Sequence, residues 1–299
     1  MGEPPARARL MAHAETRYLE AKRSVDDRAL APRVRERLLG SLGDAPRVLE
    51  AGCGTGATVP RLLDWGVRSG SYRGVDRDDG VVDFARRVRP AALRYAGHDV
   101  VGAEGGFEVD DLSVAFETGD ALEAFGDESK ADLFVAAAFA DLVPLDDLVE
   151  TVESALAPGG LAYLPITFDG GTVFQPDHPA DAAVERAYHD AIDRVPGRDA
   201  RAGRHLADRL RRRPGDLLAM AASDWVVRPR GGDYPTDEAY FLGRILAFVE
   251  AALAGGSGAG AERVDDLEEW LTARRDQLAA GELTYVAHQY DLLYRTPEP

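Results

Sequence analysis

Residues 48–56 read Val-Leu-Glu-Ala-Gly-Cys-Gly-Thr-Gly, a short apolar run that leads into three glycines at alternate positions. Residues 47–50 have the length and apolar character of a buried strand, and the stretch through Leu62, Leu63 and Trp65 has the spacing of an amphipathic helix. Glycine lets the backbone turn tightly and leaves no side chain between the chain and a ligand. The stretch therefore predicts a strand, a ligand-binding loop and a helix.

The same alternation of strands and helices continues along the first half of the chain. Strands are predicted over 72–76, 113–117, 132–138 and 161–166, with helices over 81–88 and 145–156 and further helices between 8 and 42. Such alternation favours a parallel, doubly wound α/β sheet.

Beyond Phe168 the alternation stops. We expect a loop over 169–181, helices over 182–195, 205–222, 236–253 and 264–280, a glycine-rich linker over 254–260, and strands over 225–230 and 283–294.

Composition excludes several classes of function. The formal net charge of −17 repels phosphate backbones, so we expect no nucleic-acid partner, and it fits a protein adapted to high salt. A single cysteine, Cys53, excludes an internal disulfide and a cysteine-rich zinc site, and no metal is expected. No apolar run reaches the roughly 18–20 residues of a membrane span, and the N-terminus has no apolar leader. We therefore expect a cytoplasmic protein without membrane contact, whose oligomeric state stays open.

Two acidic residues extend the predicted ligand site. Asp76 ends the second strand, 20 residues after Gly56, where a carboxylate can accept hydrogen bonds from both hydroxyls of a ribose. Asp120 follows the third strand and adds a polar group at the same edge of the sheet. The glycine spacing also satisfies the G-x-G-x-x-A pattern of dinucleotide-binding proteins, so the residues alone leave a nicotinamide cofactor open.

Residues 47–168 resemble the class I S-adenosylmethionine-dependent methyltransferases in the glycine loop, the two acids and the Leu-x-Pro-Gly-Gly turn at 156–160. The resemblance implies a Rossmann-like, doubly wound sheet, mostly parallel, with one antiparallel C-terminal strand. It implies S-adenosylmethionine as cofactor, with its ribose on Asp76 and its adenine on Asp120. The full set of implied cofactor-binding residues is Glu50, Gly52, Cys53, Gly54, Gly56, Asp76, Arg77, Asp120, Ala121 and Ala138.

The same resemblance divides the chain into an N-terminal helical lid over 1–44, a cofactor-binding core over 45–170, and a helical substrate cap over 171–299 that includes the last two strands. Tyr18 and Lys22 would line the entrance. Residues 138–141 read Ala-Phe-Ala-Asp and lack the Asn/Asp-Pro-Pro-aromatic motif of enzymes that methylate amide or base nitrogens. With the negative charge, this favours a small-molecule acceptor, methylated on oxygen or nitrogen.

Three residues are candidate general bases. His178 lies in the loop expected after the fifth strand, and Tyr188 and His189 lie on the next helix, in the region that commonly covers the reacting end of the cofactor. Two other functions remain open: an NAD(P)-dependent oxidoreductase, and a cofactor-binding scaffold protein without catalysis.

Overall fold

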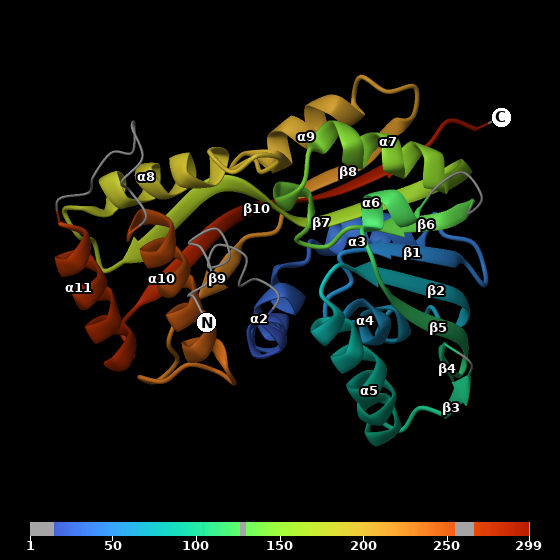
Figure 1. The fold of residues 1–299 in the computed structure, drawn as a ribbon, viewed down its shortest axis with the longest axis horizontal. Coiled ribbons are helices and arrows are strands. Elements are labelled where there is room, and N and C mark those ends of the chain that lie inside the picture. The colour runs from blue at the N-terminus through green and yellow to red at the C-terminus, as the bar shows by residue number, and fades with distance from the viewer. Residues whose placement is uncertain (1–14, 104, 126–129, 255–265, 299) are drawn as a thin grey trace, which may run out of the picture.

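The computed structural model describes residues 15–103, 105–125, 130–254 and 266–298, which form one sheet of ten strands covered by helices (Figure 1). In spatial order the strands are β3 (Val100–Ala103), β4 (Gly106–Val109), β5 (Asp111–Thr118), β2 (Ser69–Asp76), β1 (Arg47–Ala51), β6 (Ala131–Val135), β7 (Leu156–Gln175), β10 (Thr284–Arg295) and β8 (Asp216–Ala222). The short β9 (Trp225–Val227) pairs with β10 outside this path.

The centre of the sheet is parallel, and the order reverses at β1. Strands β5, β2, β1, β6 and β7 pair in parallel, whereas β10 runs antiparallel between β7 and β8. The predicted mostly parallel sheet with one antiparallel C-terminal strand is thus confirmed. Strands β3 and β4 add an antiparallel hairpin at the β5 edge.

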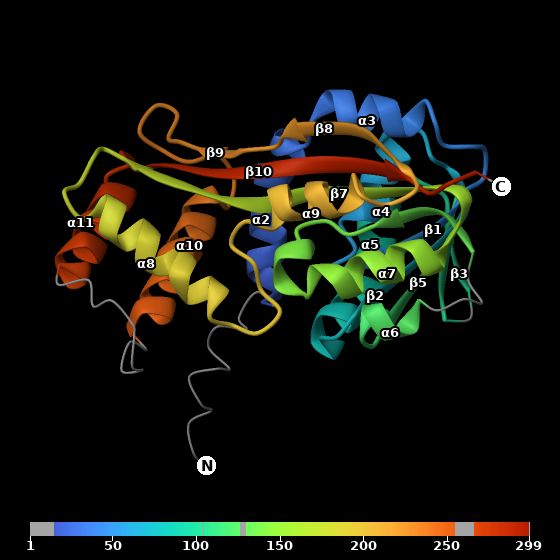
Figure 2. The ribbon, with the colours of Figure 1, turned by 90° about the horizontal axis from the view of Figure 1, so that it is seen from above.

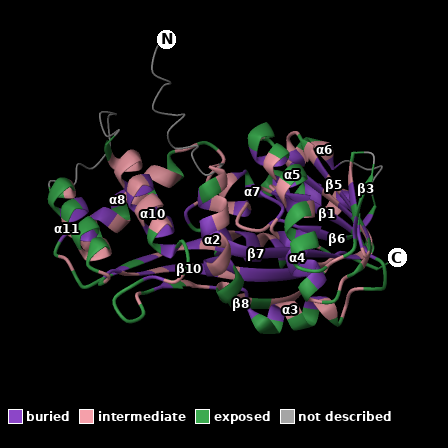
Figure 3. Cartoon of the chain, turned by 90° about the horizontal axis from the view of Figure 1, so that it is seen from below, coloured by how far each residue is buried: buried purple, intermediate pink, exposed green. Residues whose placement is uncertain are grey.

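Alternate residues of the central strands supply the two apolar faces of the sheet. Val48 and Leu133 face one core, whereas Leu49 and Phe134 face the other. The first core lies under α3 (Pro32–Leu39), α4 (Thr58–Asp64) and α5 (Asp79–Tyr95), and the second under α6 (Ala121–Ala124), α7 (Leu145–Ala155) and α9 (Ala202–Leu210). Figure 2 shows α3 on one side of the β7–β10–β8 region and α7 and α9 on the other. The strands are buried between these layers (Figure 3).

A second lobe is built on the far halves of β7 and β10, which run on together beyond the core (Figure 1). Four helices pack there around a third apolar core: α2 (Thr16–Ala29), α8 (Asp181–Asp193), α10 (Glu238–Ala254) and α11 (Leu267–Ala279). Trp270 is fully buried at its centre, with its ring edge against Phe174 of β7. The long strand pair therefore joins the core to the helical lobe.

Several predicted elements of the second half were wrong. The loop expected over 169–181 is strand as far as Gln175, because residues 167–175 pair with 284–290 of β10. The helix expected over 205–222 ends at Leu210, and residues 216–222 form β8. The strand expected over 225–230 is reduced to β9, and β8 is the edge of the core sheet.

Most other boundaries agree with the predictions to within three residues. However, α5 extends to Tyr95, seven residues beyond its predicted end, and β7 begins at Leu156, five residues before its predicted start. The β3–β4 hairpin and α6 were not predicted. The predicted N-terminal helices are α2 and α3, and the final strand of 283–294 is β10. The first 14 residues of the predicted lid, and the predicted linker from 255 on, lie outside the described residues. No helix within the described ranges is both long and apolar enough to cross a membrane.

Candidate functional site

The glycine loop joins β1 to α4 at the carboxyl edge of the sheet. Gly52, Gly54 and Gly56 all have positive φ angles, of 68°, 51° and 74°, which side chains disfavour. The amides of Gly52 and Cys53 both donate to the carbonyl of Val75 on β2, over 2.9 and 3.2 Å. A Cβ atom on Gly52 would overlap the ring of Phe139, and one on Gly56 would lie 2.5 Å from Cζ of Phe116. The loop is thus confined to glycine by both conformation and space.

Glu50 stabilises this loop from beneath. Its carboxylate is 2% exposed and accepts hydrogen bonds from Oγ1 of Thr58, at 2.7 Å, and from the hydroxyl of Tyr72. Burial raises the pKa of Glu50 to about 7, although the two hydrogen bonds act in the opposite direction. The side chain therefore holds the start of α4 against β2 and lies behind the loop.

Asp76 lies directly beside the loop at the end of β2. Its Oδ2 accepts the amide N–H of Gly54 at 2.9 Å, and its Oδ1 accepts that of Asp78 at 3.0 Å. Asp78 in turn caps α5 through the amide of Val81, at 2.9 Å. Since the Asp76 side chain is only half-buried, the sheet presents a fixed carboxylate next to loop backbone that is partly exposed at Gly52 and Gly54.

Asp120 follows β5 and is joined to Arg77 of the neighbouring strand end by an ion pair of 2.9 Å. Its other oxygen accepts the amide of Leu122 at 3.0 Å and so caps α6, while Ala121 is buried. Ala138 follows β6 with a φ of +50°, and its amide donates to the carbonyl of Pro165 at 3.0 Å. All the sequence-predicted cofactor residues thus lie at the carboxyl ends of β1, β2, β5 and β6.

Helix α2 lies against the glycine loop. Leu19 approaches Gly54, so that a Cβ there would lie 3.4 Å from Cδ1 of the leucine. Glu20 forms an ion pair with Arg89 of α5, and Arg89 also donates to the carbonyl of Thr55 in the loop. The N-terminal helix is therefore held on the loop by charged as well as apolar contacts.

The three candidate bases lie in different surroundings. His178 lies in the turn before α8, where its Nδ1 accepts the amide of Ala180 at 3.2 Å. His189 is buried, with Nε2 2.9 Å from Oγ1 of Thr172, and burial lowers its pKa and so favours the neutral ring. Burial raises the pKa of Tyr188 to about 12, and the charges of Arg198 and Asp141 act on the same hydroxyl. Their role as bases stays a prediction.

Asp141 is an acidic residue at the same edge of the sheet that the sequence analysis did not assign to the site. It lies in η2 (Ala140–Leu142), the short helical turn directly after β6, and it is half-buried. Burial raises its pKa, whereas its own backbone amide, Arg198 and Lys22 lower it. Its place after the fourth predicted strand was the available signal.

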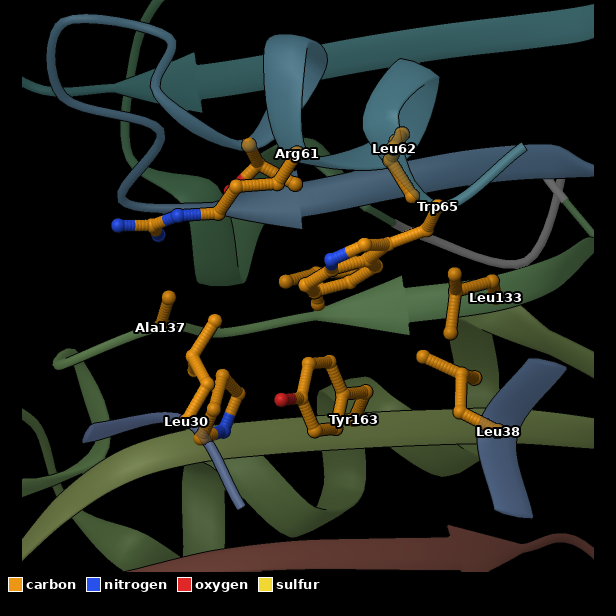
Figure 4. Close-up of a pocket in the computed structure, with 11 residues that line it drawn as sticks. Leu30, Leu38, Arg61, Leu62, Trp65, Leu133, Ala137 and Tyr163 are labelled. Carbon is orange, nitrogen blue, oxygen red and sulfur yellow. The ribbon is translucent and has the colours of Figure 1, made fainter. Parts of the chain in front are cut away.

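A small void elsewhere in the core is not a ligand site. It lies between α3, α4 and the sheet, where Trp65 and Tyr163 face each other across it (Figure 4). Its volume of about 10 Å³ holds at most one water molecule. No group of three or more metal-ligating side chains comes together among the residues whose placement is given.

No protein-family model matches this chain, and no curated protein matches its sequence. Solved structures do match. A candidate methyltransferase of Bacillus halodurans C-125 has a TM-score of 0.51 and 14% identity, over 89% of this chain and 100% of that one. A methyltransferase of Thiobacillus denitrificans in complex with S-adenosylhomocysteine covers 98% of this chain and 99% of its own, at a TM-score of 0.46 and 18% identity. Geranyl diphosphate C-methyltransferase of Streptomyces coelicolor matches over 87% of this chain and 74% of its own, at a TM-score of 0.44 and 16% identity.

The first of these matches and the strand order together show that this chain has the class I methyltransferase fold. The resemblance to this class that the sequence predicted is thus confirmed for the fold.

Proposed function

We propose that this chain is an S-adenosylmethionine-dependent methyltransferase that acts on a small-molecule acceptor. The observation that carries the proposal is the hydrogen bond between the amide of Gly54 and the carboxylate of Asp76, which fixes a ribose acceptor beside a glycine loop. Such a pairing at the point where the strand order reverses is the place where open α/β sheets bind nucleosides.

The residues present fit this cofactor. A carboxylate has about four acceptor positions, and the amides of Gly54 and Asp78 occupy two of them, so Asp76 can still accept both ribose hydroxyls. Gly52 and Gly54 are partly exposed, which leaves backbone open to the methionine end. Asp120 and Arg77 would border the adenine, together with the backbone of Ala121.

The remaining cofactor assignments are less direct. The carboxylate of Glu50 is occupied by Thr58 and Tyr72, so we assign it the support of the loop. Cys53 and Gly56 are buried and contribute through the loop backbone, and Ala138 borders the same space from β6.

When bound, S-adenosylmethionine would supply an activated methyl group. The protein then has to hold the acceptor in line with it, and such positioning can contribute ~7–11 kcal/mol. We assign this positioning to residues 15–44 as a lid and to residues 171–299 as a cap. The contacts of α2 with the loop, and the packing of α2 and α8 in one apolar core, support that division.

The test is a titration of the protein with ligand, in which binding is detected by the shift in the melting temperature. S-adenosylhomocysteine at micromolar concentration should raise the melting temperature, whereas NAD should not. Asp76→Ala should weaken this binding about tenfold through the loss of ribose hydrogen bonds, each worth ~0.5–1.5 kcal/mol. Arg212→Ala, an exposed change beyond α9, should bind as the wild type does.

Other outcomes identify the competing functions. Stabilisation by NAD alone would favour an oxidoreductase. Binding of S-adenosylhomocysteine without transfer of labelled methyl to any compound of a metabolite extract would favour a non-catalytic scaffold. Equal binding by Asp76→Ala and wild type would show that the cofactor lies elsewhere.

A further inference from the structure

We propose that a cleft between α2, β9 and α10 is a binding site for a small molecule that carries a phosphate group. The cleft has a volume of about 270 Å³, and Arg28, Arg228 and Arg230 lie in its walls. The proposal concerns a second site and does not depend on the proposed methyl transfer.

The cleft lies where three segments far apart in the sequence meet. Helix α2 packs against both β9 and α10 (Figure 1). None of the residues assigned above to the cofactor, all of which belong to the described ranges, lines the cleft. Leu19, which approaches the glycine loop, precedes Arg28 by nine residues on α2, a rise of about 13 Å along the helix. The cleft is therefore at the other end of α2 from the proposed cofactor site.

The first arginine is held at the cleft by a buried acid. Glu238 of α10 is 1% exposed, and its carboxylate accepts hydrogen bonds from both Nη atoms of Arg28, at 2.5 and 3.0 Å. The hydroxyl of Ser24 donates to the same carboxylate at 3.2 Å, and the carbonyl of Ser24 accepts from Nη1 of Arg28 at 3.0 Å. A guanidinium has five N–H groups, and these contacts use three of them. Arg28 is thus fixed in position and retains two donors for a ligand.

The other two arginines follow β9 on a stiffened stretch of backbone. Residues 228–230 read Arg-Pro-Arg, and the proline ring fixes its own φ angle between the two arginines. The amide of Arg230 donates to the carbonyl of Asp233 at 2.7 Å, which holds the end of the stretch. Both side chains are exposed, and among the residues with a described placement neither guanidinium has a hydrogen-bond or ion-pair partner. Their donors are therefore open to a ligand.

Two acids also line the cleft, and both already have partners. Glu238 is paired with Arg28, and Oδ1 of Asp224 lies 2.8 Å from Nδ1 of His288 and 3.4 Å from the amide nitrogen of Gln289. Three guanidinium groups against two carboxylates leave the cleft with an excess of positive charge. The net charge of −17 opposes this only weakly inside the cleft, because salt largely screens exposed charges more than about 8 Å apart.

The three guanidinium groups match a phosphate ester better than a carboxylate. One guanidinium can bind both oxygens of a carboxylate, whereas a phosphate monoester has three terminal oxygens and a charge of about −1.5 to −2 at pH 7, and so can engage several guanidinium groups. Val25 and Val226 add apolar surface to the same cleft. The volume is close to the lower limit of about 300 Å³ for small-molecule sites. These features favour a phosphate monoester with a small apolar part.

The experiment is calorimetric titration of the full chain at neutral pH with four probes: phenyl phosphate, inorganic phosphate, benzoate and phenol. We expect phenyl phosphate to bind at one site, at least tenfold more tightly than benzoate and a few-fold more tightly than inorganic phosphate. Phenol should not bind measurably. Saturation with S-adenosylhomocysteine should leave the affinity for phenyl phosphate unchanged, because the two sites have no residue in common.

The variants test whether the cleft holds the phosphate. Arg228→Gln and Arg230→Gln should each weaken the binding of phenyl phosphate at least tenfold, and both should fold normally because these side chains are exposed. Arg212→Gln removes the same charge from an exposed position beyond α9 and is the matched control, which should bind as the wild type does. Asp224→Asn keeps an acceptor for His288 but removes a negative charge from the cleft, and should strengthen binding a few-fold.

The remaining outcomes overturn the proposal. If phenyl phosphate does not bind the wild type at millimolar concentration, or if S-adenosylhomocysteine displaces it, the cleft is not a phosphate site. Equal losses in Arg212→Gln and Arg228→Gln would show that only the net charge matters, and weaker binding by Asp224→Asn would contradict an anion held by charge. Tighter binding of benzoate than of phenyl phosphate would refute the choice of phosphate. Binding of S-adenosylhomocysteine itself tests the proposed function separately.

Discussion

Glu50→Gln should remove a pH dependence of stability that originates beneath the cofactor loop. The carboxylate is almost fully buried, and burial raises its pKa from 4.5 to about 7. Each pKa unit corresponds to about 1.36 kcal/mol, so ionisation of this group costs the folded state about 3 kcal/mol. Glutamine has nearly the same shape and can still accept the hydrogen bond of Thr58, but it does not ionise.

The sign of the effect follows from which state holds the proton. Below pH 4.5 the carboxyl is protonated in both states, and its contribution to stability is complete. Between pH 4.5 and about 7 the unfolded chain releases the proton while the folded protein retains it, so the free energy of unfolding falls as pH rises. Above that range both states are ionised and the curve is flat for this group.

The assay is urea unfolding of wild type and variant across this range. Because the isoelectric point is 4.8, the series should begin near pH 5.5. About 2 kcal/mol of the fall in the free energy of unfolding then lies between pH 5.5 and pH 7. The difference between the two proteins is the readout, since other titrating groups cancel in it. Tyr72→Phe removes a hydrogen bond that lowers the pKa of Glu50, and should move the upper end of the range to higher pH. Parallel curves for wild type and Glu50→Gln would refute the reasoning.

Two further changes test the packing around the site. In Gly56→Ala the alanine must adopt a positive φ, and its Cβ lies 2.5 Å from Cζ of Phe116. The free energy of unfolding, measured in urea, should therefore fall by about 2–5 kcal/mol. Gly66→Ala has a similar φ but open space around it, and a loss as large as that of Gly56→Ala would exclude the steric explanation. Asp291→Ala leaves two buried amides without the acceptor that they now have at 2.8 and 2.9 Å, and should cost about 3 kcal/mol or more in thermal or urea unfolding. A loss below 1 kcal/mol would show that water replaces the carboxylate.

The core could be predicted from the sequence because its signals are local. Residues 47–166 alternate between the periods of strand and helix, and each glycine or proline turn lies next to the element that it ends. Asp76 and the glycine loop could be placed together because the carboxyl ends of parallel strands share one edge. Their hydrogen bond in the structure is the consequence of that rule.

The second half could not be predicted because its strands depend on distant partners. Residues 167–175 contain Gly170 and Gly171 and resemble a turn, yet they pair with residues more than 100 positions later in the chain. Strand β8 follows α9 after Pro214 and Gly215, which mark the end of a helix but not the start of a strand at the sheet edge. Contacts over such separations leave no period in a short stretch of sequence.

The place of the helical lobe could not be predicted for the same physical reason. Tyr18 of α2 and Tyr188 of α8 both pack in the apolar core on the far halves of β7 and β10, and no local pattern in the sequence joins these helices. Since β7 also pairs with β6 inside the core, the same strand determines the position of the turn after β6 and of the lobe that contains α2 and α8. The extension of β7 beyond the core is therefore the feature that attaches the helical lobe to the sheet.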